Sequence, residues 1–332
     1  MEVAFFHSGA REFGTPAAID PDREPHRFER GEHAWTVQTC VRLARAGLPV
    51  GLVDRAPTRG IVVFHAKERR ELLRSLPSGA DVLLVGIRAD NGECRAADAE
   101  VVQNGRFADG RRRVFIPFWP QPGLVPRDSG RGESIRRAAF KGFTRNLAPE
   151  LRSPAWSGFL ASLGIEWVLD GVDYHDHVAG RDGLRWADYR DVDLVVALRE
   201  PDPRLHTGKP AAKLYNAWSA GVPAVLGREH AYREMRQSEL DYLEAEGLAG
   251  AQAAVTRLLA DPGLYRRMVE HGRRRAAEFT VEHIVERWRA LLFAELPAFA
   301  ATRRGRLIRR TPVPLKAWVR VASRLLALRP RR

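Results

Sequence analysis

The sequence predicts an α/β protein with two Rossmann-like, doubly wound domains that face a cleft. Short, continuously apolar runs alternate with helical patterns, and a proline-rich stretch divides this alternation into two halves. Apolar runs without a polar face are typical of parallel strands that helices cover on both sides. The length of 332 residues fits two domains, at about 150 residues for each.

Each half has its own apolar runs, which we predict to be strands. Helical patterns lie between them, at 34–46 and 67–76 in the first half and at 149–163 and 211–220 in the second. Beyond residue 227 the pattern predicts helices to about 297. The predicted strands are 3–7, 50–54, 61–65, 81–87, 99–104 and 113–118, followed by 135–142, 166–170, 193–199 and 223–227.

The break between the halves is rich in proline and glycine. Proline removes a backbone donor and restricts the residue before it, so neither helix nor strand is expected to continue there. The boundaries we predict are an N-terminal domain at 1–120, a linker at 121–132, a C-terminal domain at 133–300 and a basic tail at 301–332.

The positive charge is concentrated at the C-terminal end. The formal net charge is +13, but the stretch from Arg303 to Arg332 holds eleven basic residues and no acid, which leaves +2 for the rest. A basic protein often binds nucleic acid. Because the body is nearly balanced, we expect no nucleic-acid partner for it.

Several classes of protein are disfavoured by composition. Two cysteines, Cys40 and Cys94, do not make a disulfide framework or a zinc site. No run of about 18 apolar residues predicts a membrane-spanning helix, and the first residues lack the pattern of a signal peptide. We therefore expect a cytoplasmic protein.

The most informative stretch is 208–227, which follows the strand at 193–199. Lys209 and Lys213 are four residues apart and share one face if the helix begins at Pro210. Cations at a helix N-terminus oppose the helix dipole unless an anion lies there. The pair therefore suggests a site for a diphosphate; the alternative is two solvated lysines on a surface helix.

This region resembles the donor half of retaining, family-4-like glycosyltransferases with the GT-B fold. The resemblance lies in Asp193-Leu-Val-Val-Ala, a loop, and then Leu214-Tyr-Asn-Ala-Trp-Ser-Ala-Gly-Val-Pro-Ala-Val. The closing helices at 261–288 are similar to the end of that domain. The N-terminal half resembles an uncharacterised bacterial subgroup of such enzymes and would be the acceptor domain.

The resemblance implies a nucleotide-sugar donor site in the second half and no protein-bound metal or other cofactor. By its frame, Tyr215 and Asn216 hold the nucleoside, while a loop after the first strand and the end of a later strand approach the diphosphate. Two glutamates that the family usually carries fall on Gly208 and Asn216 here. Glu200 or Asp202 could substitute from the loop. The donor-binding candidates are Gly142, Arg145, Asn146, Arg199, Lys209, Lys213, Tyr215 and Asn216.

On the first domain, an acceptor would bind beyond the carboxyl ends of the strands. His65 lies at such an end and is our catalytic candidate, because a histidine can act as a base or orient a sugar hydroxyl. His7 and Asn104 are similarly placed. The polar run 170–177 has suitable metal-ligand types but matches no template, so we expect an exposed loop.

The tail is predicted to contain a basic amphipathic helix. Beyond Pro314, Lys316, Arg320 and Arg324 recur every four residues, as in helices that lie on anionic lipid at the inner face of a membrane. The alternatives are a helix docked on the body and a disordered arm. The helix at 281–295 is the better candidate for a return to the first domain.

The function we predict is transfer of a sugar, of the hexosyl class and with retention, from a nucleotide diphosphate to an acceptor. A lipid-linked or envelope-polysaccharide acceptor would suit a membrane-bound tail. A non-catalytic scaffold that binds a nucleotide sugar is the alternative, favoured by the missing glutamates. A nucleic-acid binder acting through the tail is a third hypothesis.

Overall fold

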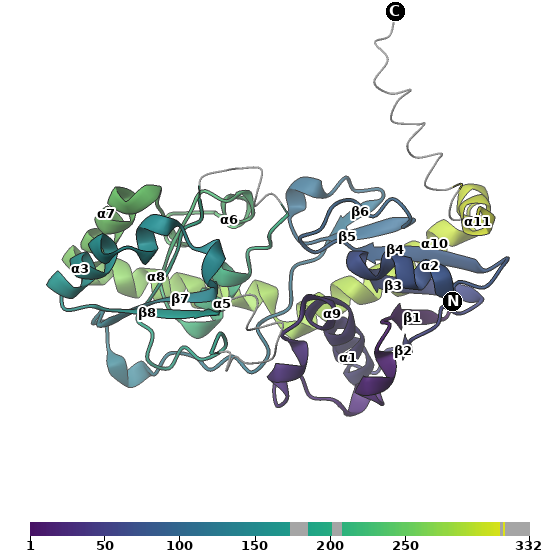
Figure 1. Cartoon of the computed structure of the whole chain (residues 1–332), viewed down its shortest axis with the longest axis horizontal. Coiled ribbons are helices and arrows are strands. Elements are labelled where there is room, and N and C mark those ends of the chain that lie inside the picture. The colour runs from purple at the N-terminus through teal and green to yellow at the C-terminus, as the bar shows by residue number, and fades with distance from the viewer. Residues whose placement is uncertain (173–184, 201–207, 313–314, 316–332) are drawn as a thin grey trace, which may run out of the picture. The chain divides into compact units, whose positions relative to one another are not determined.

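The computed structural model describes residues 1–172, 185–200, 208–312 and 315. The chain divides into two compact units, which we describe separately (Figure 1). Unit 1 comprises Met1–Pro117 and the chain from Val281 onward, and unit 2 comprises Phe118–Thr280. The prediction of an α/β fold with two parallel sheets is confirmed.

Unit 1 contains a six-stranded parallel sheet in the order β2-β1-β3-β4-β5-β6. Every one of its strands coincides with an apolar run that the sequence predicts. They are β1 (Val3–Phe6), β2 (Val50–Val53), β3 (Arg59–His65), β4 (Asp81–Ile87), β5 (Ala99–Val102) and β6 (Arg113–Phe115).

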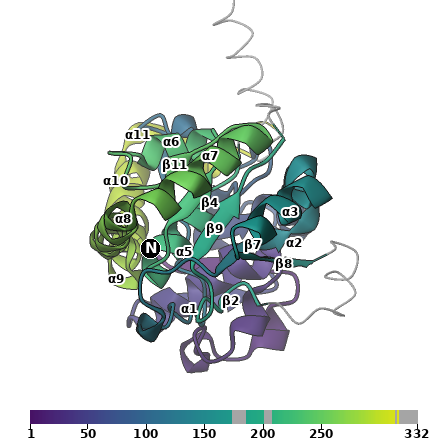
Figure 2. The same cartoon turned by 90° about the vertical axis from the view of Figure 1, so that its left-hand side faces the viewer.

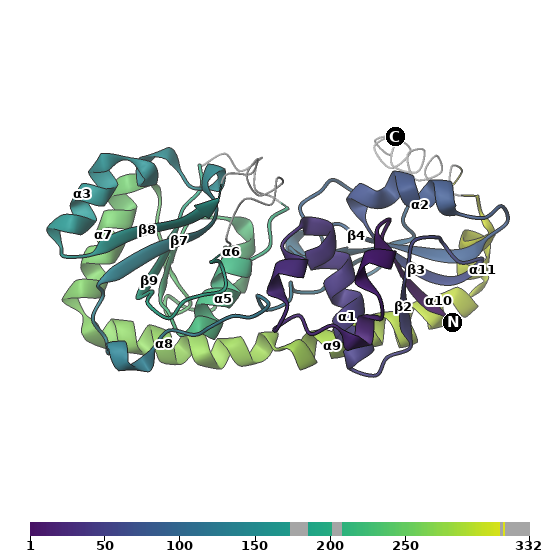
Figure 3. The ribbon, with the colours of Figure 1, turned by 60° about the horizontal axis from the view of Figure 1, so that its bottom comes forward.

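Helices cover both faces of the unit 1 sheet. Successive side chains of a strand point to opposite faces. Phe64 and Leu84 pack with Leu72 of α2 (Arg69–Ser75), whereas the Phe5 ring lies 6.2 Å from that of Trp288 of α9 (Val281–Ala290). Figure 3 shows α2 above these strands and α9 below them.

The predicted helix at 34–46 has two parts. A π-helical turn covers His33–Val37, and α1 follows at Gln38–Arg45. Short 3-10 turns at Ala10–Phe13, Pro16–Ala18 and Pro25–Phe28 precede them. A π-helical turn widens the helix locally and is frequent at functional sites; it places His33 beside His7, with ring centroids 5.0 Å apart.

Unit 2 contains a five-stranded parallel sheet in the order β11-β10-β9-β7-β8. Four of its strands were predicted, and the short strand β11 was not. They are β7 (Arg137–Phe143), β8 (Glu166–Val172), β9 (Leu194–Ala197), β10 (Ala224–Leu226) and β11 (Leu243–Glu244).

The helices of unit 2 pack around that sheet, and Figure 2 shows the strands with α3 to their right and α8 to their left. Trp156 of α3 meets Trp167 of β8 edge to face, 5.6 Å between centroids. The predicted helix at 149–163 begins with a 3-10 turn, Pro149–Arg152. The helices are α3 (Pro154–Ser162), α5 (Ala212–Ala220), α6 (His230–Met235), α7 (Gly247–Ala260) and α8 (Pro262–Ala276).

The predicted linker at 121–132 differs from what the structure shows, because this segment is anchored within unit 2. Arg127 and Arg131 both donate to Asp193, at N–O distances of 2.8 to 3.0 Å. The Asp193 side chain is fully buried and also accepts from the backbone N–H groups of Arg136 and Arg137. A buried carboxylate needs such partners, so the segment is fixed to the start of β9.

The C-terminal boundary also differs from the prediction. Residues 281–300, which the predicted boundary assigns to the second domain, form α9, a π-helical turn at Leu291–Glu295 and α10 (Leu296–Ala301) of unit 1, which agrees with the predicted return of the helix at 281–295 to the first domain. Beyond them, α11 (Arg303–Arg310) packs on β4, and Arg309 lies 3.3 Å from Asp81. The start of the predicted tail is therefore a docked helix, whereas most of the predicted amphipathic helix at 312–332 lies outside the described residues.

Candidate functional site

Three side chains and the backbone of one glycine come together at the carboxyl ends of three neighbouring strands of unit 2. Gly142 lies near the end of β7, Arg199 follows β9 and Glu229 follows β10. Lys213, on the first turn of α5, reaches the same edge. We call Gly142, Arg199, Lys213 and Glu229 the edge cluster. Ligands of doubly wound sheets bind at this edge.

Gly142 leaves room for the Lys213 amine beside the end of β7. Its φ is +144°, and a Cβ at this position would lie 2.7 Å from Lys213 Nζ. The amine also lies 5.1 Å from the centre of the Phe140 ring. Only a glycine lets the lysine cross the strand end so closely, because any other residue would be strained in this conformation and would displace the amine.

The surroundings of Lys213 weaken its hold on a proton. Burial, followed by the charge of Arg199, lowers the pKa of Lys213 to about 7; the charge of Lys209 acts in the same direction, and that of Glu229 opposes it. A bound anion would reverse this effect, because it stabilises the charged amine. We therefore expect the Lys213 amine to be fully protonated when an anion binds.

Arg199 and Glu229 form an ion pair beside it. Arg199 Nε lies 3.2 Å from Glu229 Oε1, and each side chain is about one tenth exposed (10% and 9%). Burial raises the pKa of Glu229, against the charges of Arg199 and Lys213. Within the described ranges, the buried Arg199 Nη1 has no hydrogen-bond partner. The same holds for both carboxylate oxygens of Glu229. The edge cluster thus combines two basic side chains with one carboxylate, and Arg199 Nη1 is a donor that a ligand could use.

Three further donor-site candidates, Lys209, Arg145 and Asn146, lie within four residues of a member of the edge cluster in the sequence. Lys209 precedes α5, which begins at Ala212 rather than Pro210, so the two lysines do not share a helix face as predicted. Arg145 is exposed, with its guanidinium 5.8 Å from the Phe143 ring centre. Asn146 ends the 3-10 turn that follows β7. Their role in donor binding is a proposal.

Tyr215 and Asn216 pack away from the edge cluster. The Tyr215 ring stacks on Phe279, 4.4 Å between centroids, and burial raises the pKa of its hydroxyl. The Asn216 side chain is hydrogen-bonded to that of the buried Tyr189. Both residues face the interior of unit 2, so we leave them out of the proposed site.

Glu229 is the member of the edge cluster that sequence reasoning missed. It follows the strand at 223–227 by two residues, and that position beyond a strand end was the available signal. Gly227 lies beside it, since a Cβ there would lie 2.4 Å from Glu229 Oε2. The carboxylate thus lies in the space beside Gly227.

We expect Gly142→Ala to weaken nucleotide binding and to destabilise unit 2 by about 1–3 kcal/mol, because the new side chain would be strained and would displace the amine of Lys213. Urea unfolding and nucleotide-induced thermal shifts measure the two effects. Gly158→Ala is the matched control: this position on α3 has open space around its would-be Cβ. A Gly142→Ala protein that binds nucleotide normally would contradict the packing argument.

In unit 1, His65 lies where the sequence places it, at the end of β3, and is buried. Its Nδ1 accepts from the backbone N–H of Lys67 at 3.3 Å, and burial lowers the pKa of the ring. Asn104 caps the 3-10 turn Gly105–Phe107 by accepting from Arg106 N–H at 3.3 Å. Asn104 thus has a structural role.

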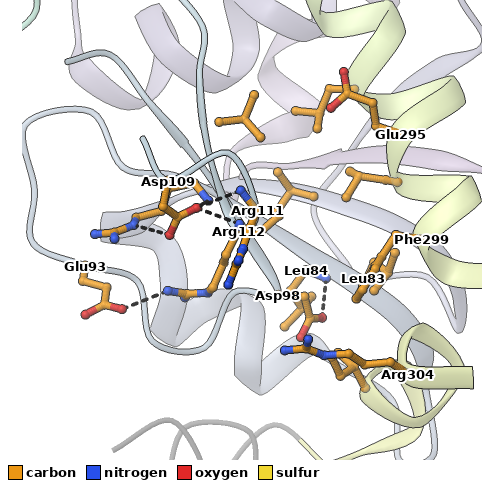
Figure 4. A pocket seen from close by; sticks show the side chains of 17 residues that line it. Leu83, Leu84, Glu93, Asp98, Asp109, Arg111, Arg112, Glu295, Phe299 and Arg304 are labelled. Carbon is orange, nitrogen blue, oxygen red and sulfur yellow. Dashed lines mark hydrogen bonds and ion pairs between the residues drawn. The ribbon is translucent and has the colours of Figure 1, made fainter. Parts of the chain in front are cut away.

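A cavity of about 720 Å³ in unit 1 lies at the amino-terminal part of the sheet (Figure 4). Its walls include Leu83 and Arg113, near the starts of β4 and β6, and Phe299 of α10. Figure 4 shows Arg112 paired with Glu93, and Asp109 bonded to the backbone of Arg111 and Arg112. This cavity is not at the carboxyl edge where we expect the reaction.

The described part of the chain has neither a cluster of metal-ligand side chains nor a membrane-spanning helix. No group of three or more His, Cys, Asp or Glu side chains there could hold a metal ion. No helix among these residues has the length and apolar character needed to cross a bilayer.

Solved structures with the same fold are glycosyltransferases of the GT-B class. Sucrose-phosphate synthase from Thermosynechococcus elongatus has a TM-score of 0.58 and 15% identity, covering 91% of this chain and all of the other. HepE of Anabaena, in complex with UDP and glucose, has a TM-score of 0.54 and 12% identity, covering 89% of this chain and all of the other. These likenesses establish the fold as GT-B.

The sequence comparisons agree with the fold. Residues 136–290 match the family described as "Glycosyl transferase-like", and no curated protein sequence matches the chain. The fold of the chain is therefore that of GT-B glycosyltransferases, as the resemblance implied, and residues 136–290 are similar to the glycosyltransferase-like family.

Proposed function

We propose that this protein transfers a sugar from a nucleotide diphosphate donor to an acceptor hydroxyl. The observation that carries the proposal is the edge cluster, where Lys213 and the free Nη1 of Arg199 meet at the strand ends beside Gly142. The HepE structure, which contains UDP and glucose, supports a nucleotide sugar as the ligand.

In this proposal the cations meet the charge of the leaving diphosphate. Lys213 and Arg199 contact its oxygens, with Lys209 and Arg145 at the rim. Fixed cations that face a developing charge stabilise the transition state without reorganising. Glu229 holds Arg199 through their 3.2 Å ion pair, so the guanidinium is oriented before the donor arrives.

The proposal also includes the class of acceptor and binding of the protein to a membrane surface. α11 exposes Leu307, which is 70% exposed, among arginines such as Arg306 and Arg310. A helix of this kind binds anionic lipid, at about 1 kcal/mol for each basic residue. We propose a lipid-linked or envelope-type carbohydrate acceptor for this reason, with the chain peripheral on a membrane. Flotation of the protein with vesicles containing phosphatidylglycerol tests this.

A panel of UDP- and GDP-sugars tests the donor. A ligand that binds only the folded protein at 100 times its Kd stabilises it by about 2.7 kcal/mol, which raises the melting temperature by several degrees. Release of nucleoside diphosphate then measures turnover. Binding without turnover on any acceptor would favour the non-catalytic scaffold, and the absence of any thermal shift would refute the donor site.

The resemblance implies a hexosyltransferase that retains configuration. The two glutamates typical of that group are replaced by Gly208 and Asn216 in this chain. The stereochemical outcome therefore depends on other side chains of this protein.

A further inference from the structure

The cavity of about 720 Å³ in unit 1 lies between the sheet and the helices that end the described chain (Figure 4). Strands β4, β5 and β6 form one wall, and the π-helical turn Leu291–Glu295, α10 and α11 form the other. Ligand sites in proteins have volumes of about 300–1,000 Å³ and mostly apolar walls with a few polar groups. The cavity therefore has the size of a ligand site.

Specific contacts hold α11 in the wall of this cavity. Thr302 caps the helix, because its Oγ1 accepts from Gly305 N–H at 2.9 Å. Gly305 lies so close to the end of α10 that a Cβ there would overlap the carbonyl oxygen of Phe299. Arg309 of the same helix lies 3.3 Å from Asp81, at the start of β4. This side of the cavity is thus a helix fixed by its neighbours.

Apolar side chains line the cavity on both the strand side and the helix side. They are Leu83, Val85 and Val114 from the strands, and Leu296, Phe299 and Ile308 from the helices. On α11, Arg304 and Ile308 are four residues apart and share the face that lines the cavity. Leu307, the neighbour of Ile308, is 70% exposed. A hydrocarbon chain beside Ile308 would therefore be removed from water, which favours binding.

Two arginines that line the cavity have no partner. Arg304 of α11 and Arg111, which precedes β6, are exposed and form no side-chain hydrogen bond or ion pair with other described residues. The carboxylates of the wall already accept from other groups: Glu93 from Arg112 at 2.8 Å, Asp98 from Leu84 N–H at 3.0 Å, Asp109 from Arg113 at 2.9 Å and Glu295 from Arg287 at 3.4 Å. The unpaired charges are therefore positive and favour an anionic group.

We propose that this cavity binds one acyl chain of an anionic membrane lipid, whose charged head contacts Arg304 at the start of α11. The inference goes beyond the proposed sugar transfer and does not depend on it. The outer face of α11, with Leu307 and Arg310 exposed, is the surface that we propose to lie on lipid. A lipid chain that enters beside this helix would reach the cavity while its head stays at the membrane surface.

Alkyl phosphates test the cavity in the whole chain, because each has one hydrocarbon chain and one phosphate and can be used below its micelle concentration. In calorimetric titrations we expect the affinity to rise about two- to fourfold for each CH₂ from octyl to decyl phosphate. Decyltrimethylammonium, which has the same chain and the opposite charge, should bind more weakly. Equal or tighter binding of this cation would overturn the anionic head.

Two pairs of variants on α11 locate the binding site. We expect Ile308→Trp, which fills the cavity, to weaken binding of decyl phosphate by about tenfold or more, whereas Leu307→Trp on the exposed face leaves it unchanged. Arg304→Ala should weaken it by about 3- to 10-fold, and Arg303→Ala, at the exposed neighbouring position, should not. Thermal unfolding without ligand identifies the variants that fold, and the arginine pair suffices if Ile308→Trp does not.

Three further results would overturn the inference. The first is an affinity that does not change with chain length, and the second is wild-type affinity in a folded Ile308→Trp or Arg304→Ala protein. The third is binding of decyl phosphate without flotation on phosphatidylglycerol vesicles, which would exclude the membrane as the source of the lipid. None of these results affects the donor site, because nucleotide-induced thermal shifts measure that site separately.

Discussion

Lys213→Met is expected to abolish the nucleotide-induced thermal shift and to leave the ligand-free protein at least as stable as the wild type. The wild-type amine has a pKa of about 7 instead of 10.5, so the folded state holds a proton less tightly than the unfolded state. At about 1.4 kcal/mol per pKa unit, and allowing for the water that reaches a half-buried amine, the charged lysine costs the folded protein roughly 3 kcal/mol. Methionine fills similar space without that cost, and the Arg199–Glu229 ion pair stays intact.

The direction of this effect follows from how the unfolding free energy depends on pH. Between pH 7 and 10.5 the unfolded wild type binds more protons than the folded protein, so its stability rises with pH across that window. Lys213→Met lacks this rise, and its advantage should be largest at pH 6 and smallest near pH 10 in urea unfolding. Arg257→Met, which removes an exposed cation of α7, is the control. Normal nucleotide binding by Lys213→Met would refute the donor site.

Asp193→Asn is expected to lower the unfolding free energy of unit 2 by about 3–5 kcal/mol. Burial opposes the ionisation of Asp193, but hydrogen bonds from Arg131, the backbone of Arg136 and Arg127 outweigh it and lower its pKa. An amide would leave two buried guanidiniums without their carboxylate and turn an N–H group toward other donors.

Urea unfolding at pH 7 measures this loss. Because the pKa of Asp193 is lowered in the folded state, its contribution is present above pH 4 and is lost as the pH falls through the folded value; the difference between wild type and variant should shrink in acid. Faster trypsin cleavage within 121–132 should accompany the loss. Glu239→Gln, at an exposed ion pair, should cost less than about 1 kcal/mol. An Asp193→Asn protein as stable as that control would contradict the argument.

The strands were predictable because both sheets are parallel and buried. Each strand is then a continuous apolar run, such as 81–87. The short strand β11 (Leu243–Glu244) was missed, because two residues give no periodicity. The helix at 34–46 was predicted, but its π-helical turn at His33–Val37 was not.

The edge cluster was predictable in part. Gly142, Arg199 and Lys213 were selected because they lie near strand ends or at a helix start, and the structure brings them together. Tyr215 was selected from the family's frame, yet its ring packs on Phe279, since neighbouring residues on a helix point about 100° apart. Glu229 was missed because an isolated glutamate has no distinctive spacing.

By itself, the sequence determined the α/β class, the parallel strands, the division into two units and the GT-B resemblance, because these depend on local periodicity and on composition along the chain. Only the tertiary structure decided that α11 (Arg303–Arg310) packs on β4, that 121–132 is anchored by Asp193, and that His7 pairs with Glu68. Burial and charge pairing depend on which distant residues meet, and His7 and Glu68 are 61 positions apart. No local sequence pattern predicts such a contact.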